Sequence, residues 1–337
     1  MKIAIATTTI HISNVIALHQ EYYPDAVIHI AGDRKTPHGQ MRAFIKTLPN
    51  VRYYSPEDQQ VYACSEPIGW NKIMRRNLAI LEAIKDGADV IVSIDDDNIP
   101  MTRNHIPAMG KLLELPFSGC ILSSENHWLN PGIFLVPPVI IRGFDFDKKG
   151  GALIYETVVR KKVGVAAGLS LGDPDITAAE WLVNPPKVTG YHELLESGFV
   201  VSPDTWSPFN SQNTAWRREL APLMFVIPFV GRYDDIWCCY IAERIMRETD
   251  FHIYFGKPFS LQSRVAHNYI SELALEMPGI KYTDQLCKFL DSLTLPHGDV
   301  NEKLKAIFTE LKETDFFPQE ASDAGIAWCE DITKVWK

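Results

Sequence analysis

The sequence lacks the short motifs that identify several common enzyme classes. Its 20 glycines form neither a G-x-G-x-x-G turn nor a Walker loop, the glycine patterns that bind dinucleotides and triphosphates. H-E-x-x-H, which marks zinc peptidases, is also missing. These absences argue against hydride-transfer, P-loop and zincin chemistry, so we expect neither a flavin nor NAD as cofactor.

Long runs of one residue class are lacking as well. No window of about 18 apolar residues occurs, so we expect no membrane span. No block of Lys and Arg is long enough to follow a nucleic-acid backbone, and the formal net charge is −9, so we expect no nucleic-acid partner. The six cysteines form no C-x-x-C pair and show no disulfide-framework spacing, and the first apolar stretch is too short for a signal peptide. We therefore predict reduced thiols and a cytoplasmic protein.

The composition is typical of a globular protein with a substantial core. Hydrophobic residues make up 46% of the 337 residues and charged residues 22%. In the first third, apolar strand patterns alternate with helical periodicity. The predicted strands cover residues 2–7, 26–31 and 90–94, and the predicted helices cover residues 13–20 and 70–86, the second ending at Gly87. This alternation predicts an open, mostly parallel α/β sheet.

The later part of the chain has a different character. Residues 116–208 are rich in Pro and Gly, which indicates strands joined by long active-site loops. Helical periodicity returns over residues 236–247, 282–293 and 300–313. We predict one catalytic domain over residues 1–270 and a helical C-terminal extension over residues 271–337, packed on that domain.

Three consecutive carboxylates, Asp95-Asp96-Asp97, directly follow the apolar strand at residues 90–94. Like charges repel, so this cluster has a cost unless a cation neutralises it. In an extended chain Asp95 and Asp97 point the same way, and a divalent cation would bridge them to a diphosphate. An acidic surface turn is the alternative. Because ligands of parallel α/β sheets bind at the carboxyl ends of the strands, we favour a site for a metal and a nucleotide.

Three other features carry groups suited to chemistry, each with a structural alternative. In the segment 231–237, Gly-Arg-Tyr-Asp-Asp-Ile-Trp, Asp234 or Asp235 is as consistent with a helix N-cap as with a catalytic carboxylate. Arg142 stands beside a glycine, where a lone arginine is more often part of a surface or loop ion pair. His267 is, on its own, more typical of a structural histidine than of a metal ligand.

Taken in order, these blocks resemble the flavin-independent nucleotide-sugar mutases of the reversibly glycosylated polypeptide family, typified by plant UDP-arabinopyranose mutases. Residues 94–97 match the family's I-D-D-D motif, residues 142–144 its R-G-aromatic motif, residues 168–175 its G-L-x-L-x-x-P-D block and residues 231–237 its G-R-Y-D-D-x-W block. Asn213 falls where the family has M-N-L-A. Each motif alone is weak, but the ordered set, over about residues 90–290, is specific.

The resemblance implies a GT-A-like fold, in which helices flank a mostly parallel nucleotide-diphospho-sugar-binding sheet. It implies a mutase that interconverts the pyranose and furanose forms of a UDP- or GDP-linked sugar, with Mn²⁺ or Mg²⁺ on Asp95 and Asp97. Some bacterial relatives use GDP-hexoses, so the base and the sugar stay open. The nucleotide-diphosphate sugar is the expected partner, and a homo-oligomer is one option for the assembly.

The resemblance also implies roles for single residues. The catalytic set is Arg142, Arg232, Asp234 and Asp235, with either aspartate as the base for a ring hydroxyl. The family's modified arginine falls on Arg142, which is then either a covalent sugar carrier or a diphosphate clamp. The implied substrate and nucleotide contacts are Asp33, Arg75, Arg76, Asp95, Asp96, Asp175 and Asn213.

The sequence departs from the plant proteins in places. Residues 32–37 and 75–77 look more like another glycosyltransferase-like family, the plant STELLO proteins and their microbial relatives. A family histidine falls on Gln262, so the third metal ligand is either His267 or Gln262. A glycosyltransferase of the same fold and a non-catalytic sugar-nucleotide scaffold are the competing functions. The Arg142 and 231–237 motifs favour a mutase over the former, and the intact triple Asp argues against the latter.

Overall fold

The apolar runs of the first third form the parallel part of a ten-stranded sheet. In this computed structural model, which describes residues 1–264 and 268–336, the strand order begins β3-β2-β1-β4. These strands are β1 (Ile3–Thr9), β2 (Val27–Gly32), β3 (Val51–Tyr54) and β4 (Val90–Ser93). All their mutual pairings are parallel, so their carboxyl ends meet at one edge. The connecting helices are α1 (Asn14–Tyr22), α2 (His38–Ile45) and α3 (Arg76–Lys85).

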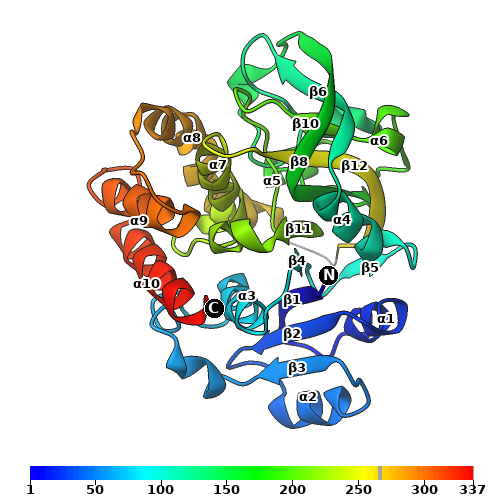
Figure 1. Cartoon of the computed structure of the whole chain (residues 1–337), viewed down its shortest axis with the longest axis vertical. Coiled ribbons are helices and arrows are strands. Elements are labelled where there is room, and N and C mark those ends of the chain that lie inside the picture. Colours follow the sequence, from blue (N-terminus) through cyan, green and yellow to red (C-terminus); the bar gives the residue numbers. More distant parts are fainter. Residues whose placement is uncertain (265–267, 337) are drawn as a thin grey trace.

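The second part of the sheet mixes parallel and antiparallel pairs and continues as β11-β8-β6-β10-β12-β5. Its strands are β5 (Asn98–Pro100), β6 (Phe117–Ser124), β8 (Leu153–Gly172), β10 (Phe199–Val201), β11 (Thr214–Arg217) and β12 (Phe251–Gln262). The long strand β8 pairs with β6, β11 and β12. A small separate sheet joins β7 (Leu135–Val136) to β9 (Gly190–Tyr191). Strand β11 therefore joins the parallel strands to the mixed part, which lies above them in Figure 1.

Helices cover the mixed part and one flank of the molecule. They are α4 (His105–Glu114), α5 (Ala178–Val183), α6 (Leu194–Ser197), α7 (Asp234–Met246), α8 (Tyr269–Ser292), α9 (Val300–Leu311) and α10 (Gln319–Val335). Short 3-10 helices include η2 (Ile73–Arg75), η5 (Arg218–Leu223) and η6 (Gly231–Tyr233). Helices α8, α9 and α10 gather beside α7 on one flank (Figure 1).

The predicted α/β fold with C-terminal helices is confirmed, and most predicted elements lie within a few residues of the observed ones. The helix predicted over residues 70–86 begins later, because Asn71 has a positive φ of 57° and only η2 and α3 follow it. Gly87 has a φ of 77°, as expected of a residue that ends a helix. All six cysteines are free, as predicted.

The C-terminal helices share the core of the part of the chain that precedes them. The indole of Trp328 on α10 stacks on Phe225, and its Nε1 donates a 2.7 Å hydrogen bond to the carbonyl of Pro222 in η5. Phe308 on α9 packs edge-on against the same Phe225. Helix α9 begins with a capping box between Asp299 and Glu302, which satisfies its first amides. These contacts bury apolar surface between the tail and the segment that precedes α7.

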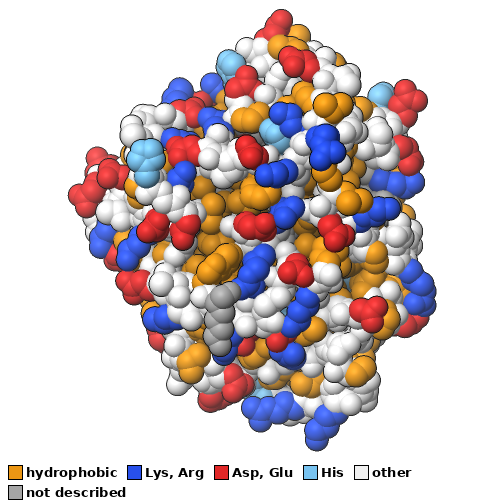
Figure 2. Space-filling model, viewed as in Figure 1, with side chains coloured by type: hydrophobic (Ala, Val, Ile, Leu, Met, Phe, Trp, Pro, Cys, Tyr) orange, Lys and Arg blue, Asp and Glu red, His pale blue; other side chains and the backbone are white. Residues whose placement is uncertain are grey.

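The surface carries charges of both signs. Figure 2 shows Lys and Arg interspersed with Asp and Glu over one whole face, without a large area of one sign. Within residues 1–264 and 268–336, no helix is long and apolar enough to cross a membrane.

Candidate functional site

A charged cavity of about 220 Å³ lies at the carboxyl end of β4. Its lining residues are Ile73, Asp95, Asp97, Arg142, Ser211, Gln212, Arg232, Asp234, Asp235, Gln262 and Arg264. Seven of these are residues that the sequence singled out for chemistry, Gln262 among them, although they lie up to 167 positions apart in the chain. The fold therefore brings the three main predicted motifs to one place.

The Asp95–Asp97 turn is held from below by polar side chains. The Asn98 Oδ1 accepts a 2.8 Å hydrogen bond from the Asp95 amide, and the Arg76 guanidinium pairs with the Asp95 carboxylate. Arg76 is fully buried and also donates to Ser93 and Ser211. Arg76 thus fixes the direction of Asp95 from behind the cavity.

Asp97 is a cavity carboxylate with an unpaired oxygen. Its Oδ1 is buried and has no hydrogen-bond partner among the described residues. Burial, reinforced by the charges of Asp95 and Asp96, raises the pKa of Asp97 from 3.8 to about 6. A carboxylate oxygen in this state gains from a cation placed beside it.

Arg142 is enclosed by carboxylates. Its Nε and Nη2 donate to the two oxygens of Asp175 at 2.8 and 3.0 Å, and Nη2 also reaches Asp235 at 3.2 Å. Its remaining nitrogen, Nη1, donates to the carbonyl of Arg232. Although burial alone would lower it, the charges of Asp175 and Asp235 raise the pKa of Arg142 well above its usual value. The guanidinium is therefore held as a cation in a fixed orientation.

Asp234 and Asp235 occupy the first turn of α7, and Tyr233 is the N-cap residue. The alternative that one of them is the N-cap is therefore excluded, because the helix begins at Asp234 itself. Asp235 Oδ2 accepts hydrogen bonds from the amide and hydroxyl of Ser211. Burial, followed by the charge of Asp235, raises the pKa of Asp234 to about 8. Asp235 therefore has partners for both of its carboxylate oxygens, whereas Asp234 holds its proton near neutral pH.

Two other arginines reach the cavity, and one of them was not predicted. Arg232 is 30% exposed and pairs with Glu272 and Glu276 on α8. Arg264 pairs with Asp175 at 3.2 Å, and its buried Nε has no partner among the described residues. Arg264 follows β12 in a stretch without motif character, and the only signal for it was its position just after a strand.

Several predicted substrate contacts do not line the cavity. Asp33 is buried at the end of β2, where it accepts the amides of Arg34 and Lys72. Arg75 is buried against Gln59, Ser65 and the ring of Trp70. Their bonds hold the loop before η2 against the sheet.

Asp96 and Asn213 also face away from the cavity. Asp96 accepts a hydrogen bond from the hydroxyl of Thr9, and its carbonyl accepts one from Ser13. Asn213 is buried with a φ of 49°, and it bonds the Gly168–Leu169 segment of β8. Their roles toward substrate remain predictions.

The donors for a metal ion are incomplete in the described part of the chain. No group of three or more His, Cys, Asp or Glu residues there is arranged to hold an ion. The predicted ligand His267 lies outside the described residues. Asp95 and Asp97 nevertheless fit an oxygen-preferring cation, because both line the cavity and Asp97 presents an unpaired buried oxygen.

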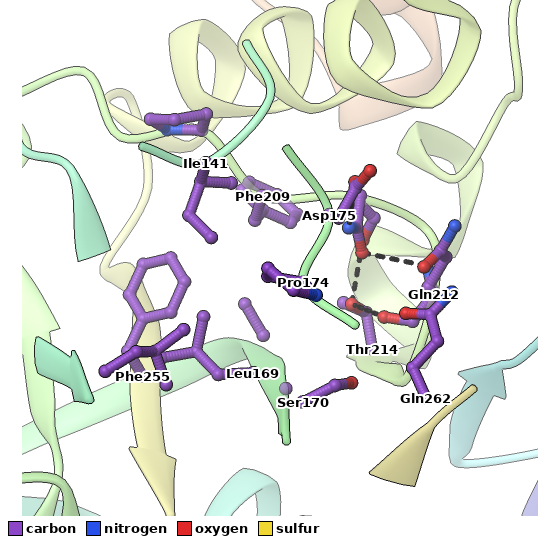
Figure 3. A pocket seen from close by; sticks show the side chains of 15 residues that line it. Ile141, Leu169, Ser170, Pro174, Asp175, Phe209, Gln212, Thr214, Phe255 and Gln262 are labelled. Atoms are coloured by element: carbon purple, nitrogen blue, oxygen red, sulfur yellow. Dashed lines mark hydrogen bonds between the residues drawn. The ribbon is translucent and has the colours of Figure 1, made fainter. Parts of the chain in front are cut away.

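Figure 3 shows a smaller pocket of about 30 Å³. Among the described residues, only Gln212 and Gln262 line both this pocket and the cavity, so the two spaces are neighbours. Figure 3 places these glutamines on one side of the pocket near Thr214, and Ile141, Leu169 and Phe255 on the other. Asp175 lies between the pocket and the Arg142 side chain that faces the cavity.

The fold and this site define an α/β protein with a charged cavity at the carboxyl edge of its parallel strands. Residues 127–336 match the family model described as reversibly glycosylated polypeptide. The match covers more than half of the chain, and the chain belongs to this family.

Two relatives are similar to this chain at low sequence identity. The chain is 26% identical over 258 residues to the probable UDP-arabinopyranose mutase 2 of Solanum tuberosum. This alignment covers 71% of this chain and 66% of the relative. The chain is also 26% identical over 217 residues to the UDP-arabinopyranose mutase 3 of Arabidopsis thaliana. This alignment covers 61% of this chain and 56% of the relative. The chain thus spans less than two thirds of the length of these relatives.

Among solved structures, glucosyl-3-phosphoglycerate synthase of Mycobacterium tuberculosis, in complex with Mn²⁺ and UDP-glucose, has a TM-score of 0.42 and 13% identity, covering 85% of this chain and 79% of the other. The mannosyltransferase PcManGT of Pyrobaculum calidifontis, in complex with GDP-Man and Mn²⁺, has a TM-score of 0.42 and 10% identity, covering 99% and 86%.

Proposed function

We propose that this chain is a metal-dependent, flavin-independent mutase that interconverts the pyranose and furanose forms of a nucleotide-diphosphate sugar. The observation that carries the proposal is the single cavity shared by Asp95, Asp97, Arg142 and Asp234. Membership of the reversibly glycosylated polypeptide family and the names of the plant relatives support it.

The reaction sets clear chemical demands. The ring cannot change size while C1 is held as an intact glycosyl phosphate, so the bond from C1 to the diphosphate oxygen breaks, with its electron pair going to the diphosphate. O4 then bonds to C1, after which the bond from O5 to C1 breaks with its electron pair going to O5. O4 loses one proton and O5 gains one before the diphosphate returns to C1, so the atoms balance without any second substrate.

A bound Mn²⁺ or Mg²⁺, held by Asp95 and Asp97, would supply positive charge to the diphosphate oxygens. Arg142 adds a fixed cation on the other side of the cavity, and its pairing with Asp175 and Asp235 orients it. We assign Arg142 to charge stabilisation rather than to covalent sugar transfer, because a nucleophilic guanidine would have to lose a proton against two carboxylates.

Asp234 fits the proton transfer between O4 and O5. A group that accepts a proton from one hydroxyl and returns it to another works best when its pKa lies near the working pH. The pKa of about 8 for Asp234 meets this condition, whereas Asp235 is fully engaged by Arg142 and Ser211. Asp234 is therefore our choice for the base.

The test is an incubation of the purified protein with UDP- and GDP-sugars and Mn²⁺, followed by chromatographic separation of furanose and pyranose products. Conversion without an acceptor supports the mutase. Conversion only in the presence of a sugar acceptor would identify a glycosyltransferase, and tight binding without any product would identify a scaffold.

A further inference from the structure

The pocket beside the cavity belongs entirely to the second part of the fold. None of its lining residues precedes Leu135, whereas the cavity also includes Asp95 and Asp97 at the end of β4. If the diphosphate lies at these carboxylates and the nucleoside lies over the parallel strands, the sugar extends away from those strands. That direction leads to the pocket, which is lined by residues of the paired strands β8 and β12.

Two glutamines stand where the cavity meets the pocket. Gln262 is 4% exposed, and no side-chain hydrogen bond joins its amide, or that of Gln212, to another residue in the described ranges 1–264 and 268–336. Their backbones are fixed, because the Gln262 carbonyl accepts the amide of Asp173 at 2.9 Å and the Gln212 amide donates to Asn210 at 3.0 Å. An amide that lines a cavity and has no protein partner is available to a ligand that both donates and accepts hydrogen bonds.

Beyond the glutamines the pocket is small. Ile141, Leu169, Phe209 and Phe255 form apolar parts of its wall, and Ser170, Asp175, Asn210 and Thr214 form polar parts. Its volume of about 30 Å³ exceeds the roughly 10–15 Å³ that one water molecule requires but is far too small for a sugar ring. The space fits one small group, such as a methyl or hydroxymethyl substituent.

We infer that Gln212 and Gln262 bind ring hydroxyls of the sugar, and that the pocket receives the exocyclic carbon on C5. The substrate class is then a nucleotide-linked six-carbon sugar rather than a pentose. This inference rests on the proposed function, because it requires a nucleotide sugar in the cavity.

The first experiment compares sugars that differ only in that carbon. Calorimetry with Mn²⁺ measures the affinity for UDP-galactopyranose against UDP-L-arabinopyranose, and for GDP-mannose against GDP-lyxose. We expect at least a tenfold tighter binding of the six-carbon member in whichever base series binds, since one methylene in an apolar pocket is worth about 10- to 200-fold. Equal affinities, or a preference for the pentose, overturn the inference and leave the proposed function standing. No binding of any of the four overturns the proposed function itself.

The second experiment fills the pocket. Leu169→Phe should abolish the preference, because it should lower the affinity for the six-carbon sugar nucleotide about tenfold and leave the affinity for the pentose nucleotide unchanged. Ser170→Leu fills the same space from a less buried position, and it decides the question if Leu169→Phe does not fold by circular dichroism. A preference that survives a folded filling variant overturns the inference.

The third experiment separates sugar binding from metal binding at the glutamines. Gln262→Ala and Gln212→Ala should each lower the affinity for the nucleotide sugar about tenfold. The affinities for the free nucleoside diphosphate and for Mn²⁺ should stay unchanged. A loss of Mn²⁺ affinity in Gln262→Ala would instead make Gln262 a metal ligand and overturn its assignment to the sugar.

Discussion

Each of the three arginines that line the cavity is paired with a carboxylate in the described part of the chain. Arg142 and Arg264 share Asp175, and Arg232 is held by Glu272 and Glu276. Although burial alone would raise it, the charge of Arg142 lowers the pKa of Asp175 to about 2, so this network stays ionised throughout the neutral range. Among the cavity carboxyls, Asp95, Asp97 and Asp234 have raised pKa values, and they are therefore the groups that can respond to a cation or a proton.

Asp97→Asn tests the metal site at this scale. The amide keeps the size of the side chain but removes the charge, so the affinity for Mn²⁺ should fall and kcat/KM should drop about 100-fold, near 2.7 kcal/mol. Glu114→Gln makes the same chemical change at an exposed site and should leave both values unchanged. Full turnover of metal-free protein in EDTA would contradict the account.

Arg142→Lys tests the role of the guanidinium. Lysine retains the charge but cannot make two hydrogen bonds to Asp175, and each lost charge-assisted hydrogen bond costs about 1.5–3 kcal/mol. The value of kcat/KM should fall accordingly, with less loss than in Arg142→Ala. Intact mass spectrometry of the enzyme trapped during turnover should show no added sugar; one sugar on Arg142 would establish the covalent carrier instead.

The pKa of Asp234 predicts the pH dependence of turnover. Because burial raises it to about 8, Asp234 is mostly protonated at pH 6 and gains its negative charge only as the pH rises through 8. A base must be unprotonated, so kcat/KM should rise about tenfold per pH unit below this pKa and then level off. In Asp234→Asn, the activity that remains should no longer rise with pH in this range. An unchanged profile in this variant would exclude Asp234 as the base.

At the scale of the element, α7 presents the first-turn aspartates to the cavity and anchors its other end with a buried acid. Glu243 is 4% exposed; its Oε2 accepts the amide of Ser207 at 3.0 Å, and its Oε1 has no partner among the described residues. Burial raises the pKa of Glu243 well above its ordinary value of 4.5. The helix therefore carries a neutral carboxyl in its core.

Glu243→Gln should change how stability depends on pH. Above pH 4.5 the unfolded glutamate ionises while the folded one keeps its proton, so the wild type loses stability as the pH rises, by up to about 1.4 kcal/mol per unit. The glutamine variant lacks this loss, so its stability relative to wild type should increase between pH 4.5 and 7. Urea unfolding at several pH values measures the difference, and the exposed Glu313→Gln should show none.

Sequence patterns predicted those elements whose signal is local. Strand β4 and helix α7 were found because a β-branched run and an apolar periodicity mark them directly. The meeting of Asp95, Arg142 and Asp234 followed only from the family resemblance, since nothing local relates residues so far apart. Strands were predicted in the region of β8, but its length of 20 residues was not, because its first half is exposed and its second half is buried, so no single period describes it.

The missed site residues share one physical cause. Arg264, Gln212 and Ser211 owe their places in the cavity to the tertiary path of β11 and β12, not to a motif. Conversely, Arg75 and Asp33 look like ligand-binding residues in sequence because buried structural ion and dipole networks use the same side chains. Residue type therefore predicted polarity at these positions but not which polar group the side chain meets.

At the scale of the molecule, the C-terminal helices are part of the core rather than an appendage. Trp328 is fully buried against Phe225 and Pro222. Trp328→Ala should destabilise the protein by about 3–5 kcal/mol, while Trp336→Ala, at a site 41% exposed, should cost far less. Urea unfolding followed by fluorescence and circular dichroism should show one shared transition. Two separate transitions would mean that residues 271–337 unfold as an independent unit.

The central claim is that the cavity interconverts two ring forms of one sugar nucleotide. The most direct measurement starts two reactions with Mn²⁺ and no acceptor, one from the pyranose form and one from the furanose form, and follows both by NMR. The account predicts that both reach the same mixture, and that Asp97→Asn slows both approaches by the same factor. The account would be contradicted if the protein binds the nucleotide sugar but both reactions keep their starting composition.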